Sequence, residues 1–532
     1  MSALTEAVGT RKTPGTVKAR KDQVQNNAGG YVFEVTPFDA FERFLILGTE
    51  GGTYYASQKA HTLQATDSMK KAFDLDGIRA VDTIVSISVN GRAPKNDQAV
   101  FALAYGASVD DDKVRKYALS KVNDVCRIGT HLFQFAEFVE KFRGWGRGLR
   151  NAVGDWYLDK DADQLAYQVT KYRQRNGWSH RDLLRLSHPV APSGDVAQVF
   201  AFASAKDLNE FSLHGKKVET LDGFMKLRDA KSVSEVVGLI GAYNISHEMI
   251  PTEFKADSKV WSALLAKGMP MTAMVRNLGV MSANGTLKPM SDNVGLVVAK
   301  LRDEVAIRNS RIHPISILFA LKTYESGHGF KGSGNWNPDS AIVDALNAAF
   351  YLSFDNVEPA NKNTLIGLDV SGSMGWGTIA NSNITPRDAS AAMAMVTVRS
   401  EPKVHTMAFA GNFQKLALTK SDSLRGVVDK VSRLNFGSTN CALPMQYATK
   451  NDLDVDTFVV YTDNETYGGS EQPFQALRKY REKSGRDAKL IVVGMTATNF
   501  TIADPRDSGM LDVVGFDTST PNILSAFSRG DF

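Results

Sequence analysis

The feature that most constrains the fold of this 532-residue chain is a change of hydrophobic pattern near residues 355–363. Before this point, apolar residues return every three or four positions, as they do along the buried face of an α-helix. After it, short runs rich in β-branched residues alternate with helical stretches. The sequence therefore predicts two architectures in one chain, an all-helical part followed by an α/β part.

The second part has the order of elements that is typical of a doubly wound, mostly parallel sheet. In such a sheet ligands bind beyond the carboxyl ends of the strands. The expected strands lie at 363–370, 404–409, 457–462 and 490–493, and the expected helices lie at 388–398, 424–431, 441–448 and 474–483.

Composition narrows the class of protein. With 43% hydrophobic and 23% charged residues the chain resembles ordinary globular proteins, and its apolar runs are far shorter than the ~18 to 20 residues of a membrane-spanning helix. The polar N-terminus lacks the apolar core of a secretion signal, so we expect a cytoplasmic protein. Cys126 and Cys441 are too far apart for a clustered metal site and are expected to be buried, reduced thiols.

The net charge of +4 comes entirely from residues 1–360, because basic and acidic residues are equal in number in 361–532. The excess is concentrated in two patches, residues 141–150 and 171–188. Such patches favour a polyanionic partner, although a single patch is more often a solvated helix face.

The second patch allows a more detailed prediction. Leu165 and Val169 indicate the buried face of a helix, and we expect Lys171 and Arg175, four residues apart, to lie together on its solvent face. Ser179 has capping-box spacing to Asp182 and should begin the next helix, which should end before Pro189. Trp178 and Tyr172 are expected to pack in the core, and His180 and His131 to be structural.

Small oxygen-bearing side chains follow two of the predicted strands and precede one helix. Asp369, Ser371 and Ser373 form Asp-x-Ser-x-Ser after the first strand, Thr439 precedes the helix near Cys441, and Asp463 follows the third strand. Each segment alone would be explained as a turn or helix cap. Together they indicate one divalent cation, and oxygen ligands without His or Cys favour Mg²⁺.

This oxygen pattern resembles the metal-ion-dependent adhesion site of von Willebrand factor A domains, in which the cation keeps a position open for an acidic group of a partner. Longer motifs resemble the bacterial Ro ribonucleoproteins of the TROVE family. These motifs are GGYVF at 29–33, GGTYY at 51–55, TKYRQRNGWSH at 170–180, LLRLSH at 183–188 and TDNET at 462–466.

The resemblance implies a basic flexible tail (1–22), a TROVE ring of HEAT-like helical repeats (23–360) and an A domain that closes the ring (361–532). It implies a monomeric ring that binds small non-coding Y RNA on its outer surface, where Lys171, Arg175 and His188 match the family's contact residues. A histidine before proline at a helix end is more often a capping group when the resemblance is set aside.

The family's central hole accepts single-stranded 3′ ends of misfolded RNA. The implied role is non-coding RNA quality control and stress response without catalysis, with an exoribonuclease tethered through Y RNA as a further partner. The basic tail is expected to be a solubilising extension or, less readily, an RNA-touching arm.

Two other functions fit parts of the sequence. The chain is alternatively a metal-dependent assembly scaffold whose A domain recruits an acidic partner. A Mg²⁺-dependent nuclease or phosphatase is disfavoured, because the oxygen-rich site lacks the further carboxylates of a two-metal centre and an evident general base.

Overall fold

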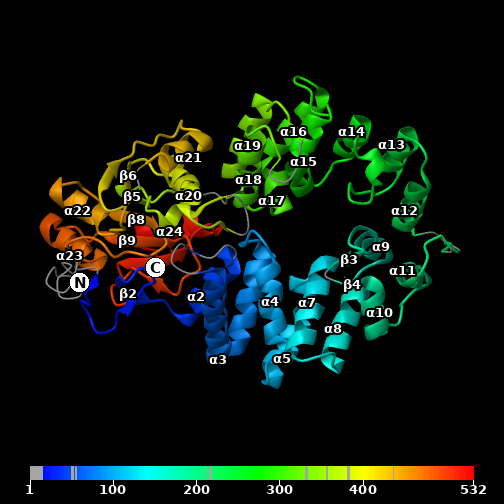
Figure 1. Ribbon diagram of the computed structural model, residues 1–532, viewed down its shortest axis with the longest axis horizontal. Helices are drawn as coiled ribbons and strands as arrows, with labels where there is room; N and C mark the ends of the chain where they lie inside the picture. Colours follow the sequence, from blue (N-terminus) through cyan, green and yellow to red (C-terminus); the bar gives the residue numbers. More distant parts are fainter. Residues whose placement is uncertain are drawn as a thin grey trace, which may run out of the picture.

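The computed structural model describes residues 16–49, 53, 57–175, 177–209, 211–214, 218–329, 334–354, 357–379, 384–434 and 437–531. It contains the two predicted parts, a curved array of helices and an α/β domain (Figure 1). None of the helices in these ranges is long and apolar enough to cross a membrane. Cys126 and Cys441 are free and buried, as predicted.

Helices make up most of the described chain between residues 37 and 352. Most start at a side-chain N-cap, and α3 is kinked at Asp76, where the backbone leaves helical geometry. Their bounds are α2 Pro37–Leu47, α3 Gln58–Asn90, α4 Asp97–Gly106, α5 Asp112–Ser120, α6 Val122–Val125, α7 Gly129–Phe142, α8 Arg147–Leu158, α9 Ala162–Lys171, α10 His180–Ser187, α11 Gly194–Ser204, α12 Glu219–Asp229, α13 Val233–Ala242, η2 Thr252–Phe254, α14 Ser258–Ala266, α15 Met271–Ala283, α16 Asp292–Arg302, α17 Glu304–Ser310, α18 Pro314–Glu325 and α19 Ser340–Leu352.

The array leaves the α/β domain and returns to it. In Figure 1 the blue and cyan helices from α2 to α10 run outward along one row, and the green helices from α14 to α19 run back along a second row. The rows meet beside the α/β domain, where Arg311 Nη1 donates to Val89 O (2.9 Å) and His313 Nε2 contacts Arg92 O (3.1 Å). Arg92 in turn pairs with Asp517 of the α/β domain. The predicted ring of helices, closed at an α/β domain, is thereby confirmed.

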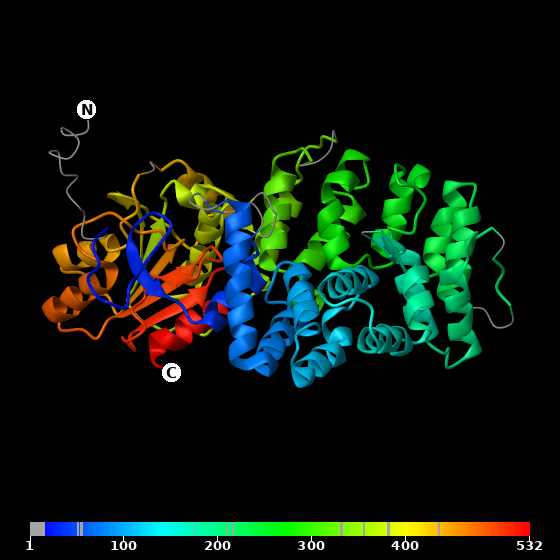
Figure 2. The same cartoon turned by 60° about the horizontal axis from the view of Figure 1, so that its bottom comes forward.

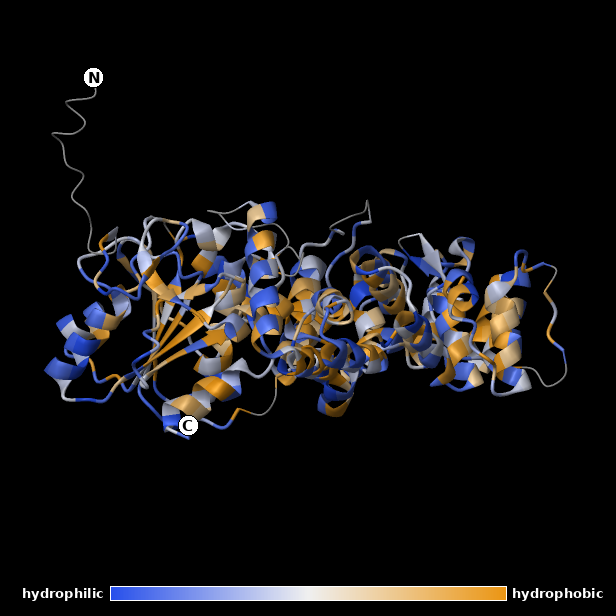
Figure 3. Ribbon diagram, turned by 90° about the horizontal axis from the view of Figure 1, so that it is seen from below, coloured by the Kyte–Doolittle hydropathy of each residue, from blue (hydrophilic) through white to orange (hydrophobic). Residues whose placement is uncertain are grey.

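The α/β domain is built on a six-stranded sheet of order β11-β9-β8-β5-β6-β7, parallel except for β7. Its strands form an apolar layer between helices, visible as orange arrows in Figure 3. The elements are β5 Thr364–Asp369, η3 Ser373–Gly375, α20 Pro386–Ser400, β6 Val404–Phe409, β7 Phe413–Lys415, α21 Leu424–Ser432, α22 Leu443–Lys450, β8 Thr457–Thr462, α23 Pro473–Ser484, β9 Lys489–Gly494, β11 Met510–Val514 and α24 Thr520–Arg529.

The start of the described chain packs on the α/β domain and not on the helices. Strand β2 (Tyr31–Glu34) pairs with β1 (Val24–Gln25) on one side and with β10 (Phe500–Thr501) on the other, and Figure 2 shows this dark blue segment against the orange and red domain. Of the predicted tail, residues 1–15 lie outside the described residues, whereas Arg20 pairs with Asp504. Residues 16–34 therefore join the two ends of the chain.

Candidate functional site

The five predicted oxygen ligands lie at the carboxyl edge of the sheet. Asp369 ends β5, and Asp463 follows β8, the strand hydrogen-bonded beside β5. Ser371 and Ser373 lie in the loop after β5, and Thr439 lies in the loop before α22. All five are at most 4% exposed. The alternation of strands and helices thus brings three distant segments to one buried edge.

Hydrogen bonds tie these segments together. The Ser371 N–H donates to Asp369 Oδ1 (2.9 Å), and Thr462 Oγ1 of β8 donates to Asp369 Oδ2 (2.7 Å). The hydroxyls of Ser371 and Ser373 lie 3.1 Å apart, and Ser373 also hydrogen-bonds the carboxylate of Asp463. Because the side chain of Ser371 also hydrogen-bonds Asp369, the two carboxylates are linked through the hydroxyls of Ser371 and Ser373.

The electrostatics of this edge suit a cation. Burial, followed by repulsion from Asp463, raises the pKa of Asp369 to about 7, and burial also raises the pKa of Asp463. The Oγ1 atom of Thr439 is buried with no hydrogen-bond partner. Two buried carboxylates and an unsatisfied hydroxyl are the ligand types of a hard divalent cation. Among the described residues no group of three His, Cys, Asp or Glu side chains could hold a metal, so hydroxyls must complete such a ligand set.

A neighbouring contact, which the sequence did not reveal, holds the loop after Asp463. The carboxylate of Glu465 accepts hydrogen bonds from Asn27 Nδ2 (2.8 Å) and from the Ala28 N–H (3.0 Å). Burial, then Asp463, raises the pKa of Glu465 to about 8. Asn26 also donates to the main-chain carbonyl of Thr466 (2.8 Å). The N-terminal segment is therefore fastened to the same loop that carries Asp463.

The basic corner differs from the prediction. Helix α9 ends at Lys171, and Arg175 lies in strand β3 (Gln174–Arg175), which pairs with β4 (Trp178–Ser179). The expectation that Lys171 and Arg175 share one face of a helix is wrong. The reason is a hairpin whose turn includes Gly177 at φ +81°, a conformation that glycine adopts without strain.

Lys171 also lacks the solvent exposure that was expected. Its side chain is 12% exposed, and its ammonium lies 3.1 Å from the hydroxyl of Tyr167 and 3.5 Å from Glu248 Oε1. It also lies over the rings of Tyr167 and Tyr172. Burial lowers the pKa of Lys171, but the two tyrosines and Glu248 outweigh this and raise it above its usual value. Lys171 is thus a charged, mostly buried side chain whose charge is balanced by Glu248.

Helix α10 follows the prediction. Ser179 and Asp182 form the capping box, and the helix ends at Ser187, with His188 as its C-cap just before Pro189. His188 adopts the left-handed conformation (φ 49°) and its N–H donates to Leu184 O (2.9 Å), so its backbone caps the helix while the residue is exposed. Trp178 stacks on Trp145, which confirms its packing role.

His180 and His131, the other two histidines considered in the sequence analysis, are structural, as predicted. His180 is buried and its Nδ1 lies 2.8 Å from the hydroxyl of Tyr157, and burial lowers its pKa to about 3. His131 Nδ1 contacts Asn96 Nδ2 (3.3 Å), and burial lowers its pKa to about 4. Neither imidazole is charged at neutral pH.

Four arginines of the corner are unpaired within the described part of the chain. Lys171 is bound by Glu248, and Asp182 is used by the helix cap. Arg173, Arg175 and Arg185 are exposed, and Arg173 and Arg181 line a pocket of about 310 Å³ between α9, α10 and α11. The cations of this corner that have no ion pair among the described residues are therefore all arginines. The sequence prediction named only one of them, Arg175.

Comparison with known proteins identifies the family. The TROVE domain model matches residues 24–241 and 243–323, and the Ro60 vWA domain model matches residues 363–528. The chain is 40% identical to the RNA-binding protein RO60 of Deinococcus radiodurans over 100% of both chains. It is 35% identical to the RNA-binding protein RO60 of Caenorhabditis elegans, over 98% of this chain and 92% of that one.

A solved structure agrees with these matches. The crystal structure of the Deinococcus radiodurans RO (RSR) protein superposes with a TM-score of 0.71 at 40% identity, covering 93% of this chain and 100% of that one. The helical ring, the sheet domain that closes it and both sequence matches lead to one conclusion. The chain belongs to the Ro family, in which a TROVE domain is joined to a Ro60 vWA domain.

Proposed function

We propose that this protein binds small Y RNA on its outer surface and the single-stranded 3′ ends of misfolded RNA in the hole of its ring. It acts as a cytoplasmic monomer in non-coding RNA quality control and stress response. It supplies binding and no catalytic step, and Y RNA tethers an exoribonuclease to it.

The observation that carries this proposal is the set of arginines at residues 173–185 that have no ion pair with any described residue. A cation without a carboxylate partner loses no ion pair when it binds a phosphate, and Arg matches phosphate geometry with two parallel donors. Two relatives that match over nearly their whole length are named RNA-binding proteins, which supports the RNA-binding part of this proposal. In this proposal Arg175 and His188 contact Y RNA directly, whereas Lys171 must first part from Glu248.

We propose further that Asp369, Ser371, Ser373, Thr439 and Asp463 hold one Mg²⁺. Such an ion would neutralise two carboxylates whose pKa values are raised by burial and, for Asp369, also by repulsion from Asp463. The hydroxyls of Ser371, Ser373 and Thr439 would orient toward it. In this proposal the ion stabilises the edge of the A domain and takes no part in RNA contact.

The test compares a Y-like stem-loop, a duplex with a single-stranded 3′ tail and its blunt counterpart, each with Mg²⁺ and with EDTA. We expect the stem-loop to bind in both conditions and the tailed duplex to bind more tightly than the blunt one. Equal affinities for the tailed and blunt duplexes at physiological salt would show that the hole does not bind single-stranded 3′ ends. Absence of specific RNA binding would favour the assembly scaffold, and RNA turnover that requires Mg²⁺ would favour a nuclease.

A further inference from the structure

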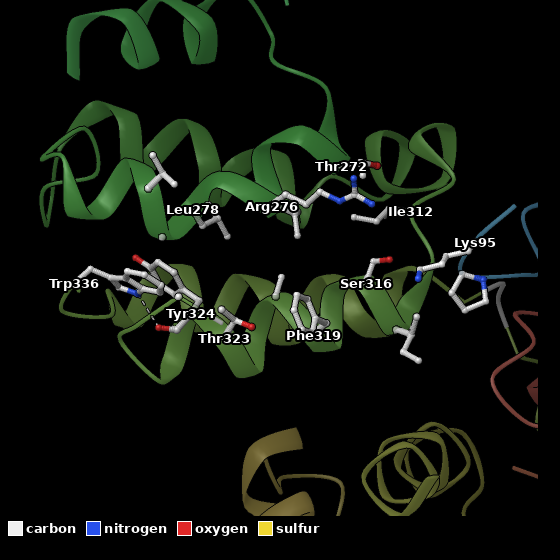
Figure 4. A pocket seen from close by; sticks show the side chains of 17 residues that line it. Lys95, Thr272, Arg276, Leu278, Ile312, Ser316, Phe319, Thr323, Tyr324 and Trp336 are labelled. Atoms are coloured by element: carbon white, nitrogen blue, oxygen red, sulfur yellow. Dashed lines mark hydrogen bonds between the residues drawn. The ribbon is translucent and has the colours of Figure 1, made fainter. Parts of the chain in front are cut away.

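Two pockets of the helical ring differ in the charge around them. The pocket between α15 and α18, of about 420 Å³, has Arg276 and Lys95 at one end (Figure 4). The second is a groove of about 970 Å³ among the first helices of the outgoing row, and its lining residues lie within 66–78 and 101–114 and at Phe142. Four aspartates and one lysine line this groove, so we call it the acidic groove.

The floor of the acidic groove is a set of aromatic rings that pack edge to face. Phe142, at the end of α7, packs in this way against Phe101 (ring centroids 5.7 Å apart) and Tyr105 (6.2 Å) of α4. Tyr105 packs similarly against Phe73 of α3 (5.2 Å). Because each ring contacts the next, their orientations are fixed. The groove therefore presents a preformed apolar surface.

Three apolar side chains that line the acidic groove are exposed to solvent. Leu75 is 66% exposed, Ile78 is 40% exposed and Phe142 is 42% exposed. Leu75 and Ile78 lie on either side of the kink of α3 at Asp76. Exposed apolar side chains that gather at one place mark interaction sites, since covering them removes apolar surface from water. An occupant of the groove must therefore offer large apolar side chains.

The charge of the rim selects the kind of occupant. Asp74, Asp76 and Asp111 are exposed, and none of them has an ion pair with any residue that the structure describes. Asp110 lies 3.5 Å from Arg143 Nη1. Such a rim repels the phosphates of RNA and attracts Lys and Arg side chains. The acidic groove is thus opposite in charge to the basic corner and complementary to a basic, apolar protein segment.

We infer that the acidic groove docks a segment of a protein partner in which large apolar side chains lie beside Lys or Arg. The apolar side chains of this segment cover Leu75, Ile78 and Phe142, and its cations meet the aspartates of the rim. An amphipathic helix laid into an apolar groove is one common form of such recognition. The inference goes beyond the proposed function, because this partner contacts the ring directly and is not held through RNA.

The test selects short random peptides, displayed on phage, for binding to the RNA-free full-length protein. We expect the enriched peptides to combine several large apolar residues with Lys or Arg. One of them, made synthetically and labelled, is then titrated with the protein by fluorescence anisotropy. The same peptide with Glu in place of every Lys and Arg should not bind, because the rim repels it.

Two double variants locate the peptide in the groove. Leu75→Gln with Ile78→Gln should weaken binding roughly tenfold or more, because apolar contact surface is replaced by polar groups. Asp74→Asn with Asp76→Asn should weaken binding and flatten its salt dependence. Asn keeps the acceptor that Asp76 offers to the N–H of Arg79, so this second variant tests the groove even if the first one does not fold.

Two matched controls change similar residues outside the groove. Leu63→Gln replaces a leucine of α3 that is 60% exposed. Asp292→Asn replaces an exposed aspartate of α16 that has no ion pair with any described residue. Neither control should change peptide binding, and a melting curve of each variant checks that it is folded.

The other outcomes overturn the inference. Absence of any enriched peptide, or equal binding of the enriched peptides to the groove variants, would mean that the groove docks no such segment. Weaker binding of the Y-like stem-loop or of a single-stranded RNA by the folded groove variants would make RNA the occupant. A dimer of the unmodified protein that these variants lose, measured by sedimentation, would make the occupant a second copy. The proposed function fails separately, if the unmodified protein does not bind the stem-loop.

Discussion

Replacing Glu248 with Gln should increase RNA affinity, because Glu248 holds Lys171 in an ion pair beside the unpaired arginines. In the present structure the Lys171 ammonium lies 3.5 Å from Glu248 Oε1, and its side chain is 12% exposed. Gln keeps the shape of the side chain but loses its charge. The ammonium is then free to move toward a phosphate, and one negative charge leaves the basic corner.

The expected magnitude follows from counting contacts. Each phosphate that a protein neutralises adds about 0.7–0.9 to the slope of log affinity against log salt. One additional contact therefore steepens the slope by about that amount. Lowering the salt concentration from 200 to 50 mM should then increase the affinity of the variant roughly threefold more than that of the unmodified protein. Arg175→Ala should flatten the slope by a similar amount, since Arg175 is exposed and has no ion pair with any described residue.

Fluorescence anisotropy of a labelled Y-like stem-loop, titrated at several salt concentrations from 50 to 200 mM, measures these slopes. Lys171→Ala should flatten the slope less than Arg175→Ala does, because Lys171 is already paired. The control is Glu304→Gln, which removes an acid that pairs with Arg308 on α17, outside the basic corner. It should leave the slope unchanged.

Two results would refute this reasoning. Unchanged affinity and slope in Glu248→Gln would mean that releasing Lys171 adds no phosphate contact. Equal losses in Lys171→Ala and Arg175→Ala would mean that Lys171 already contacts RNA as fully as an exposed arginine does. The second result would return the site to the simple two-cation surface expected from the sequence.

Three further predictions concern stability and metal binding. Asp369→Ala should weaken Mg²⁺ binding more than tenfold by calorimetry while changing the free energy of RNA binding by less than about 0.5 kcal/mol, and parallel loss of both in a folded variant would show that the sites are coupled. Gly30→Ala should lower the melting temperature sharply, since a Cβ atom there would lie 1.8 Å from the carbonyl oxygen of Thr466, and an unchanged melting curve would contradict this close approach. Burial raises the pKa of Glu248, but His247 and Lys171 outweigh it and lower the pKa to about 2, so this carboxylate contributes stability above pH 4.5 that is lost as the pH falls toward 2. The shift corresponds to about 3 kcal/mol before screening and nearer 1 kcal/mol for a side chain that is 38% exposed, and Glu248→Gln should remove that part of the acid unfolding curve measured by circular dichroism.

Local patterns were sufficient for much of the fold. The strands at 404–409 and 457–462 and the capping box at Ser179 were predicted with their observed bounds, because burial period and helix capping depend on residues a few positions apart. The oxygen ligands were also placed on one sheet edge, since parallel strands bring their carboxyl ends together. The remaining strands, among them β7, β10 and β11, were missed, because their short runs lack a distinctive pattern.

The tertiary structure decided the rest. Lys171 depends on Glu248, which is 77 residues away in the sequence, and Asn27 meets Glu465 across 438 residues. Hydrophobic periodicity cannot report such pairs, because it records which face of an element is buried and not which charge lies opposite. By itself the sequence determined most of the elements, their order and the residue types at the oxygen-rich edge of the sheet. Only the closed ring determined which cations are free for phosphate, because that depends on which distant carboxylates the packing of the helices brings within reach.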